Sequence, residues 1–282
     1  MAGGIGEGEF KRYIAEATGA FFLTMGGMLS IIGGGDLISV AAAHGLILAM
    51  MVYFIGPVSG GHCNPAVSIC LWAQKKLDNR SLAGYVSFQI VGATIGALIA
   101  VAVIPLVPWG TTAQRGATLG LLTSNTASGY FSPGGAFVLE MFMTMLLGIM
   151  VSVVVAGGER MNSISGALIG GTLFACICWG GPLTGGSLNP ARSLGPAFVS
   201  GTNQVVWASI WVYLFAPIVG GFLAAGAFMW FKGDLKIHFA SASSSNALPP
   251  PPPGTGLPAA PPPPPPLPAP PVMVGEPPKP PS

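Results

Sequence analysis

Residues 60–68, GGHCNPAVS, return at residues 185–193 as GGSLNPARS, and this repeated stretch decides the fold of the chain. In both copies a glycine pair leads into Asn-Pro-Ala. Asparagine is a preferred helix N-cap, and proline suits the first helical position, where its missing N–H is no loss. Each copy therefore predicts a helix that is entered through a tight turn. An ordinary helix start in a soluble loop would explain one copy, but not two copies 125 positions apart within apolar sequence.

The composition indicates an integral membrane protein. Of 282 residues, 51% are hydrophobic and 7% are charged, and the mean hydropathy is +0.67. Soluble domains carry about 25% charged residues, so this chain has too few charges to cover a surface in water. The small net charge of +2 does not suggest a nucleic acid partner. The four cysteines lie in apolar segments without metal-ligand spacing, so we expect no metal site, no cofactor and no disulfide framework.

The hydrophobic pattern predicts six spanning helices, each close to the ~20 residues that a bilayer requires. They lie at about 13–32, 37–55, 82–104, 136–156, 164–181 and 205–231. The apolar segment after each Asn-Pro-Ala is too short to cross a membrane, so each is predicted to be a half-helix that enters and returns. The predicted fold class is therefore all-α integral membrane, with six transmembrane helices plus two re-entrant half-helices.

These elements form an inverted repeat. Residues 13–104 and 136–231 each hold three spans and one half-helix, and an odd number of spans inverts the second repeat relative to the first. Inverted repeats with paired broken helices place a site at the bilayer midplane. The predicted domains are an N-terminus at 1–12, a channel domain at 13–231 and a tail at 232–282.

The two half-helices should meet at their N-termini, where Asn64 and Asn189 supply side-chain amides. Both amides can donate to a solute oxygen, and the carbonyls of the glycine-led stretches can line a water path. Each helix N-terminus carries roughly half a positive charge, which disfavours cations at the centre. A water held by both amides cannot easily relay a proton. The residues indicate a pore for small neutral solutes, and the same motifs should also lock the two loops together.

The two motifs, HCNPAVS and SLNPARS in a six-span inverted repeat, resemble the aquaporin (major intrinsic protein) family over about residues 10–232. The resemblance implies a passive channel in the lipid bilayer that conducts water and small neutral solutes. It also implies a homotetramer with one pore in each subunit. An enzyme is not expected, because the sequence has no nucleophile–base or metal constellation.

The resemblance implies a selectivity filter of four residues. Arg192, which lies three places after Asn189, corresponds to the filter arginine of the family, and a snorkelling helix residue is the alternative. Counting from the motifs places His44, Ile177 and Gly186 at the other filter positions, although His44 taken alone could be a buried core histidine. This set resembles the tonoplast intrinsic proteins of plants, a subgroup associated with water and ammonia permeation.

Other positions leave a glycerol or urea facilitator open as an alternative. Ser193 and Ala197 resemble the water-channel pattern, whereas Leu214, which follows Tyr213, resembles the glycerol group. The tonoplast group with this filter often has a histidine in its third loop, near Asn125 here, and this loop contains none. A further alternative is a structural membrane protein with a closed pore that acts through its tail.

Several residues near the motifs are expected to line the pore or to support it. The resemblance implies that Glu16 and Glu140, at corresponding places in the two halves, accept hydrogen bonds from loop backbone and hold the half-helices. His62 is expected to stabilise its loop, with a gating histidine as the alternative. A mercurial is expected to block the pore through Cys63 or Cys178. The remaining lining or supporting residues are Gly61, Ser187 and Leu188.

The distribution of positive charge predicts the orientation. Nine of the eleven Lys and Arg residues fall on the side of the two termini, so the positive-inside rule places both termini in the cytoplasm. The sequence does not distinguish a vacuolar-type membrane from a plasma membrane. The tail contains proline runs at 249–253 and 261–266, which favour an exposed, disordered segment of polyproline II character. A proline-binding adaptor domain is a possible partner of this tail.

Overall fold

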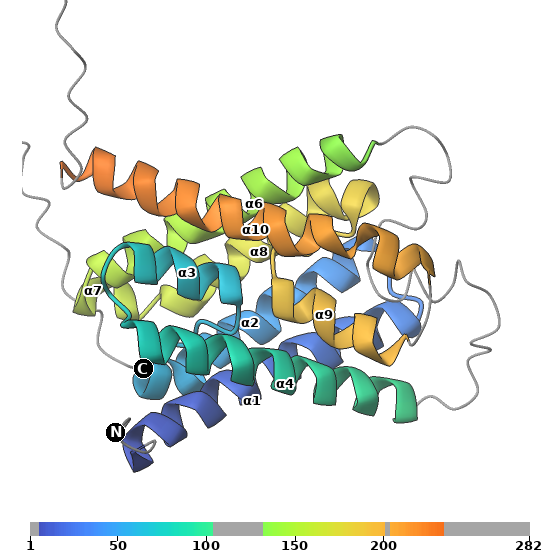
Figure 1. Cartoon of the computed structure of the whole chain (residues 1–282), viewed down its shortest axis with the longest axis horizontal. Helices are drawn as coiled ribbons and strands as arrows, with labels where there is room; N and C mark the ends of the chain where they lie inside the picture. Colours follow the sequence, from blue (N-terminus) through green and yellow to red (C-terminus); the bar gives the residue numbers. More distant parts are fainter. Residues whose placement is uncertain (1–5, 104–131, 201–203, 234–282) are drawn as a thin grey trace, which may run out of the picture. The chain divides into compact units, whose positions relative to one another are not determined.

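The computed structural model describes residues 6–103, 132–200 and 204–233, and these residues form helices joined by loops and turns (Figure 1). The chain divides into two units, Met1–Ile237 and His238–Ser282, and every described residue belongs to the first. The expected loop position near Asn125 and the proline runs lie outside the described residues. The helices are α1 (Glu7–Ile32), α2 (Leu37–Ser59), α3 (Pro65–Ala73), α4 (Asn79–Val103), α6 (Pro133–Ala156), α7 (Glu159–Asn162), α8 (Ser165–Thr184), α9 (Pro190–Val199) and α10 (Gln204–Phe231).

The described residues contain six helices that are long and apolar enough to cross a membrane, as predicted: α1, α2, α4, α6, α8 and α10. α1 begins at Glu7, six residues before the predicted start at 13. The reason is local, because Glu7 and Glu9 lie in the first turn and Glu9 accepts from the backbone N–H of Gly6. Acidic side chains stabilise the positive end of the helix dipole.

Two other helices also run past their predicted ends, and both stop at the repeated glycines. α2 is followed by Gly60, with φ 93°, and α8 is followed by Gly185, with φ 87°. Both glycines are in the left-handed conformation, which is the usual way to stop a helix. Each glycine pair therefore both ends a spanning helix and starts the turn into a half-helix.

The half-helices have the length that the sequence predicts. α3 has 9 residues and α9 has 10, so neither can cross a bilayer. Figure 1 shows them end to end in the middle of the bundle, with α4 and α10 on either side. Each half-helix contacts both α4 and α10. α7 is a single turn that the sequence did not predict.

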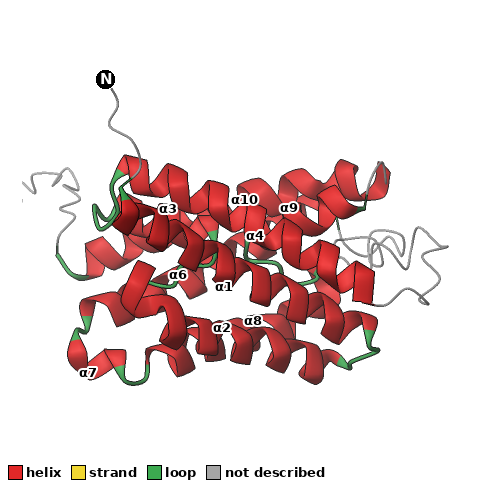
Figure 2. Ribbon diagram, turned by 90° about the horizontal axis from the view of Figure 1, so that it is seen from below, coloured by secondary structure: helices red, strands yellow, loops and turns green. Residues whose placement is uncertain are grey.

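The spanning helices pack in pairs that repeat across the two halves. α1 packs on α4, α6 packs on α10 in the same way, and α2 packs on α8 across the repeat, side by side in Figure 2. Glycines allow the close approach. A Cβ added at Gly92 would meet the carbonyl of Ala17, and one at Gly170 would meet the carbonyl of Gly45. Small residues at such positions let the backbones of membrane helices approach closely.

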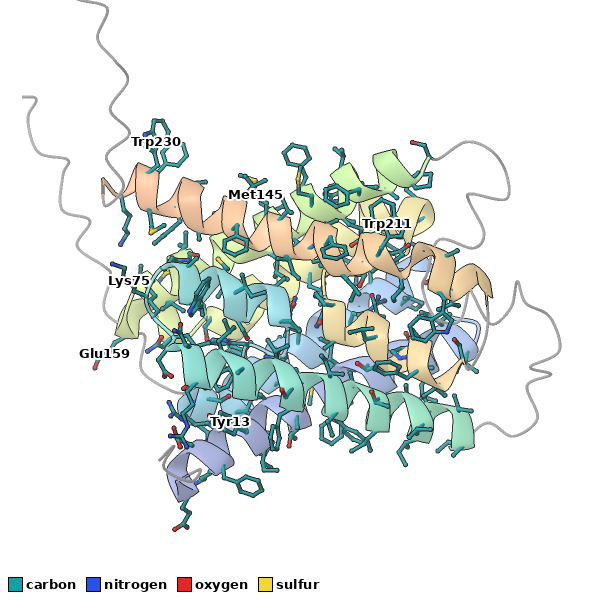
Figure 3. The ribbon with its side chains drawn as sticks, in the orientation of Figure 1. Tyr13, Lys75, Met145, Glu159, Trp211 and Trp230 are labelled. Carbon is teal, nitrogen blue, oxygen red and sulfur yellow. The ribbon has the colours of Figure 1, made fainter. Side chains whose placement is uncertain are left out.

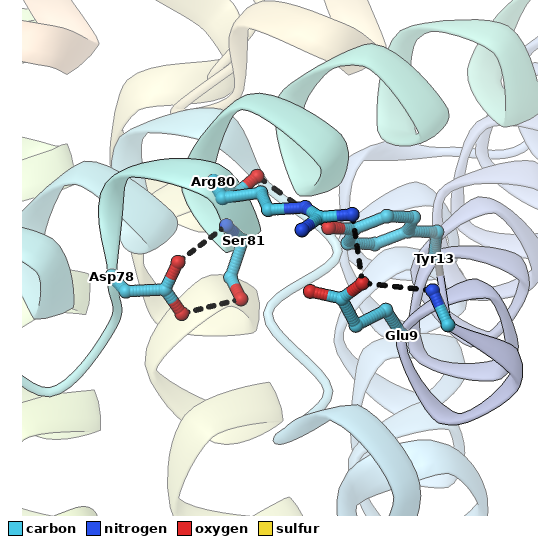
Figure 4. A network of polar contacts seen from close by, with 6 residues as sticks. Glu9, Tyr13, Asp78, Arg80 and Ser81 are labelled. Atoms are coloured by element: carbon cyan, nitrogen blue, oxygen red, sulfur yellow. Dashed lines mark hydrogen bonds and ion pairs between the residues drawn. The ribbon is translucent and has the colours of Figure 1, made fainter. Parts of the chain in front are cut away.

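Charged side chains gather at one end of the helices, where Figure 3 places Lys75 and Glu159. Figure 4 shows the contacts at this end between α1 and the start of α4. Arg80 forms an ion pair of 3.1 Å with Glu9, and the hydroxyl of Tyr13 donates to the carbonyl of Arg80 at 3.5 Å. Asp78 caps α4 by accepting from the backbone and hydroxyl of Ser81, and these bonds lower the pKa of the Asp78 carboxyl.

Candidate functional site

Two tight turns bring the half-helices together, and the turns are near copies of each other. Cys63 and Leu188, which precede the two motif asparagines, have φ angles of 53° and 54°. Non-glycine residues rarely adopt this left-handed conformation, which costs on the order of 1–3 kcal/mol each. In return, the carbonyl of each residue reaches the opposite loop. The amide Nδ2 of Asn64 donates to Leu188 at 2.8 Å, and that of Asn189 donates to Cys63 at 2.9 Å.

Each asparagine is also fixed through its side-chain oxygen. Oδ1 of Asn64 accepts from the backbone N–H of Ala66 at 2.8 Å and so caps α3. Oδ1 of Asn189 accepts from Ala191 and Arg192 at 3.0 and 3.2 Å and caps α9. An amide nitrogen carries two N–H groups, and one of them is used in the bond to the opposite loop. The second N–H of each asparagine remains to face the cavity that both residues line.

Two buried carboxylates hold the turns in their strained conformation. Glu16 accepts from the backbone N–H groups of His62 and Cys63 at 2.9 and 2.7 Å. Glu140 accepts from those of Ser187 and Leu188 at 3.0 and 2.8 Å. Both carboxylates have no exposed surface. These are the backbone contacts that the sequence predicts for the two glutamates. The bonds to charged acceptors offset the cost of the left-handed backbone.

Sequence reasoning missed the residues that complete each carboxylate site. The hydroxyl of Ser59 donates to Glu16 at 2.7 Å, and the hydroxyl of Thr184 donates to Glu140 at the same distance. The carbonyls of these two residues accept at 2.6 Å from the hydroxyls of Tyr85 and Tyr213. A signal was available, because Ser59 and Thr184 lie 125 positions apart, the same offset as the motifs.

A cavity of about 450 Å³ lies within the site. It extends from Arg192 past both asparagines to Tyr53, Asn162 and Ser165 near the charged end. Polar groups come from the two glycine-led loops, including Gly61, His62, Ser187 and Leu188. The other wall is aliphatic and includes Leu23, Leu48, Val52, Val67, Leu147, Val151, Val154, Ile169 and Leu173. A cavity lined by both polar and apolar groups can hold small neutral molecules without retaining them tightly.

The four predicted filter residues come together as two contacting pairs. Nη2 of Arg192 donates to Nε2 of His44 at 3.0 Å, while Nδ1 of His44 donates to the carbonyl of Val40 at 2.8 Å. A carbonyl only accepts, so the hydrogen of the neutral ring lies on Nδ1. Gly186 lies against Ile177, because a Cβ on Gly186 would be 3.3 Å from the Cα of Ile177. Arg192 lines the cavity, whereas His44, Ile177 and Gly186 are not on its wall.

The comparison with known proteins decides which family has this geometry. The family described as "Major intrinsic protein" matches residues 7–228. The chain belongs to the major intrinsic protein, or aquaporin, family. Its members are channels rather than enzymes, and the six spanning helices make this aquaporin a multi-pass integral membrane protein.

Similar proteins include plant and bacterial channels. Nodulin-26 of Glycine max is 34% identical over 225 residues, covering 76% of this chain and 75% of its own length. Glycerol uptake facilitator protein-like 6 of Lactiplantibacillus plantarum is 34% identical over 217 residues, covering 76% and 95%. Aquaporin NIP3-1 of Arabidopsis thaliana is 31% identical over 221 residues, covering 76% and 65%. The X-ray structure of the aquaglyceroporin from Plasmodium falciparum shows the same fold, with a TM-score of 0.63, 24% identity and 78% and 95% coverage.

Two of these relatives carry nodulin-26 and NIP names, and the resemblance of the filter to the tonoplast subgroup stays a prediction. The same holds for the roles of the individual filter residues. The bond between His44 and Arg192 lies at the end of the cavity that is opposite to the charged end.

The expected role of Cys63 divides between its backbone and its thiol. The carbonyl receives the amide of Asn189, but the thiol is fully buried against α1, where a Cβ on Gly19 would fall on its sulfur. Cys178 is half-buried and is not on the cavity wall. Neither thiol therefore lines the cavity, so a mercurial bound to either thiol would not lie in the cavity. Cys63 is a supporting residue here rather than a lining one.

His62, in contrast, reaches the cavity. Its Nδ1 lies 3.0 Å from the hydroxyl of Ser68, and its ring packs edge-on against Tyr85 with centroids 5.0 Å apart. The ring is buried, with 8% of its surface exposed. In the second half Ser187 takes the corresponding place and contacts the hydroxyl of Ser193. Both contacts join a loop to its own half-helix, which is the loop-stabilising role predicted for His62.

Proposed function

We propose that this aquaporin is a passive water channel that excludes protons and ions. The observation that carries the proposal is the cavity that both Asn64 and Asn189 line, where each amide has an N–H free of the loop contacts. A water molecule between the two amides would accept from both. Its oxygen would then be oriented by the protein, which interrupts a chain of waters that could relay a proton.

Cation exclusion has two sources in this arrangement. The N-termini of α3 and α9 meet at the centre, and each carries roughly half a positive charge. Arg192 adds a full charge at one end of the cavity, where it is 6% exposed. A buried arginine at membrane depth is costly and is normally kept for function. Both features repel cations and leave neutral solutes unaffected.

Ammonia is the second solute that we propose. Ile177 is apolar and Gly186 has no side chain, and neither lies on the cavity wall, so these two filter positions add no charge to the solute path. A small neutral amine can then replace water at Arg192 and at the two asparagines. Methylamine, which resembles ammonia in charge and hydrogen bonding, would be expected to pass more slowly because it is larger.

Glycerol or urea conduction is the second candidate function. Leu214 resembles the glycerol group, and one relative carries the name of a glycerol uptake facilitator. The aliphatic wall of the cavity also suits the carbon backbone of a polyol. If glycerol flux equals or exceeds water flux at equal gradients, this candidate replaces the water channel.

We further propose a homotetramer with both termini in the cytoplasm and a proline-binding adaptor on the tail. The charged end described above would then face the cytoplasm, in line with the positive-inside rule. The adaptor proposal rests on the proline runs at 249–253 and 261–266. Equal recovery of partners by the full chain and by a chain without residues 240–282 would contradict it.

Stopped-flow shrinkage of proteoliposomes under an impermeant osmotic gradient tests the main proposal. Wild-type protein should shrink the vesicles much faster than lipid alone and with a low activation energy. An imposed pH gradient, followed with an internal dye, should decay no faster than in empty vesicles. Shrinkage at the rate of lipid alone would contradict a water pore and favour a closed-pore structural protein.

A further inference from the structure

Gly27 of α1 lies directly against the imidazole ring of His44. A Cβ added to Gly27 would be 2.6 Å from Cε1 and 2.8 Å from Cδ2 of the ring, and it would fall closest to Nε2. Real Cβ atoms essentially never approach other heavy atoms within 3.0 Å. The ring therefore occupies the space that any side chain at position 27 would need.

The ring has little freedom to move aside. Nδ1 donates to Val40 on its own helix at 2.8 Å, and Nε2 accepts from Arg192 at 3.0 Å. The ring is 1% exposed. Unlike the end of an aliphatic chain, a planar ring with both nitrogens bonded cannot rotate to make room without losing a hydrogen bond. Loss of such a bond leaves a buried polar group unpaired, which is costly.

We propose that Gly27 is a positioning residue of the filter, because the absence of a side chain at this position lets the His44 ring lie close to the backbone of α1. This inference rests on the proposed channel function. A methyl group at position 27 would push the Nε2 edge of the ring away from α1. That edge is the one bonded to Arg192, and Arg192 lines the end of the cavity. The displacement would therefore pass to the guanidinium and narrow the solute path at that end.

The neighbouring residue Gly26 offers a matched control. A Cβ at Gly26 would meet Cδ1 of Ile47, which is the far end of a flexible side chain. Both glycines lie inside α1, so replacement by alanine changes helix propensity equally at the two sites. The difference between Gly27→Ala and Gly26→Ala then isolates the contact with the His44 ring.

The experiment compares five proteins in proteoliposomes: wild type, Gly26→Ala, Gly27→Ala, His44→Ala and the double variant Gly27→Ala/His44→Ala. Water permeability is measured by osmotic shrinkage, and urea permeability by reswelling in a urea gradient. Gly27→Ala should lower water permeability about tenfold, equivalent to ~1.4 kcal/mol in the barrier, and urea permeability by more. Overpacking a buried site commonly has an effect of this size. Gly26→Ala should match wild type.

The double variant gives the decisive comparison. Without the ring the added methyl has nothing to displace, so Gly27→Ala/His44→Ala should equal His44→Ala for both solutes. If Gly27→Ala conducts like Gly26→Ala, or if the double variant is further impaired relative to His44→Ala, the proposal is wrong. If Gly27→Ala does not fold, folding of the double variant would support the proposal, and its failure would contradict it. Wild-type protein that does not conduct would instead contradict the proposed function.

Discussion

The two ends of the cavity are built on the same backbone but carry opposite chemistry. The offset of 125 positions that relates the motifs maps each predicted filter residue onto a residue at the charged end. His44 maps onto Ile169, Ile177 onto Val52, Gly186 onto Gly61 and Arg192 onto Val67. All four mapped residues line the cavity. The filter positions thus include a histidine and an arginine, whereas the four mapped positions towards the charged end are all apolar.

The local geometry confirms that the mapping is structural. A Cβ on Gly186 would be 3.3 Å from the Cα of Ile177, and one on Gly61 would be 3.2 Å from the Cα of Val52. The supporting groups are likewise kept in both halves: carboxylate, hydroxyl, tyrosine and asparagine. The comparison shows that the parts holding the turns are shared, while the parts that select solutes are placed at one end. Four predictions test this separation.

The largest effect is expected from removing a shared support, as in Glu16→Leu and Glu140→Leu. Each change leaves two buried backbone N–H groups without an acceptor, at about 1–3 kcal/mol per group. The left-handed residues before the asparagines also lose the bonds that hold them. We expect neither variant to give a folded oligomer, measured by size-exclusion profile and thermal unfolding in detergent. A stable, conducting Glu140→Leu protein would show that the second loop does not need its carboxylate.

The second prediction removes the arginine from the filter end through Arg192→Val, which copies Val67. A unit charge about 5 Å from a passing cation raises its energy by ~3 kcal/mol at an effective dielectric constant of ~20. Removing it should increase proton or cation leak by about a hundredfold while water still passes, measured with a pH-sensitive dye in vesicles. Lysine at position 192 serves as the control that keeps the charge. An unchanged leak would move cation exclusion to the central helix N-termini alone.

Much of this arrangement could be predicted from the sequence, because the governing signals are local or repeated. Asn-Pro-Ala caps a helix wherever it stands, and a duplicated motif fixes the inverted repeat. The positions of His44, Ile177 and Gly186 follow from counting along helices without insertions. The actual ends of α2 and α8 could also have been inferred, since each stops at a left-handed glycine of the motif.

What could not be predicted depends on contacts between distant segments. No pattern indicates that Gly27 lies against His44, because α1 and α2 are joined by a turn whose geometry sets their relative rotation. The thiol of Cys63 was expected at the pore because Cys63 adjoins Asn64. Cys63, however, has a left-handed backbone, which changes the directions of its carbonyl and its side chain relative to an extended or helical residue. Its carbonyl faces the opposite loop and accepts from Asn189.

The third prediction places a histidine at the apolar end through Ile169→His. With an offset of 124, taken from Glu16 and Glu140, Gly27 maps onto Val151, which lines the same cavity as Ile169. A ring at position 169 should therefore lack the space that Gly27 leaves for His44. Water permeability should fall about tenfold, which corresponds to ~1.4 kcal/mol in the barrier caused by overpacking.

Pairing Ile169→His with Val151→Gly should restore most of the water flux, because it reproduces the spacing of the other end. Val154→Gly is the matched control, since Val154 lies on the same helix, is equally buried and lines the same cavity. Both glycine changes carry the same helix cost of ~1 kcal/mol. If Val154→Gly restored the water flux of Ile169→His as well as Val151→Gly does, the space for the ring would not depend on position 151, the counterpart of Gly27.

The smallest effect is expected where the halves differ in support. Gln89 donates to Glu16 at 2.7 Å and to Ser68 at 3.1 Å. In α10 the corresponding residue is Pro217, which cannot donate a side-chain hydrogen bond. This correspondence uses the offset of 128 positions that relates Tyr85 to Tyr213. Glu16 thus accepts from four groups and Glu140 from three. The oxygen Oε1 of Gln89 is buried without a partner in the described residues.

Gln89→Met removes two hydrogen bonds and, with them, one unpaired buried oxygen. The loss and the gain are of similar size, about 1–3 kcal/mol each, so the net change in unfolding free energy should stay within ~1 kcal/mol. Thermal unfolding in detergent measures the stability, and osmotic shrinkage should show unchanged water permeability. A loss as large as that from Glu16→Leu would mean that the first half depends on a support that the second half lacks. The shared carboxylate and hydroxyl would then not be sufficient to hold a turn.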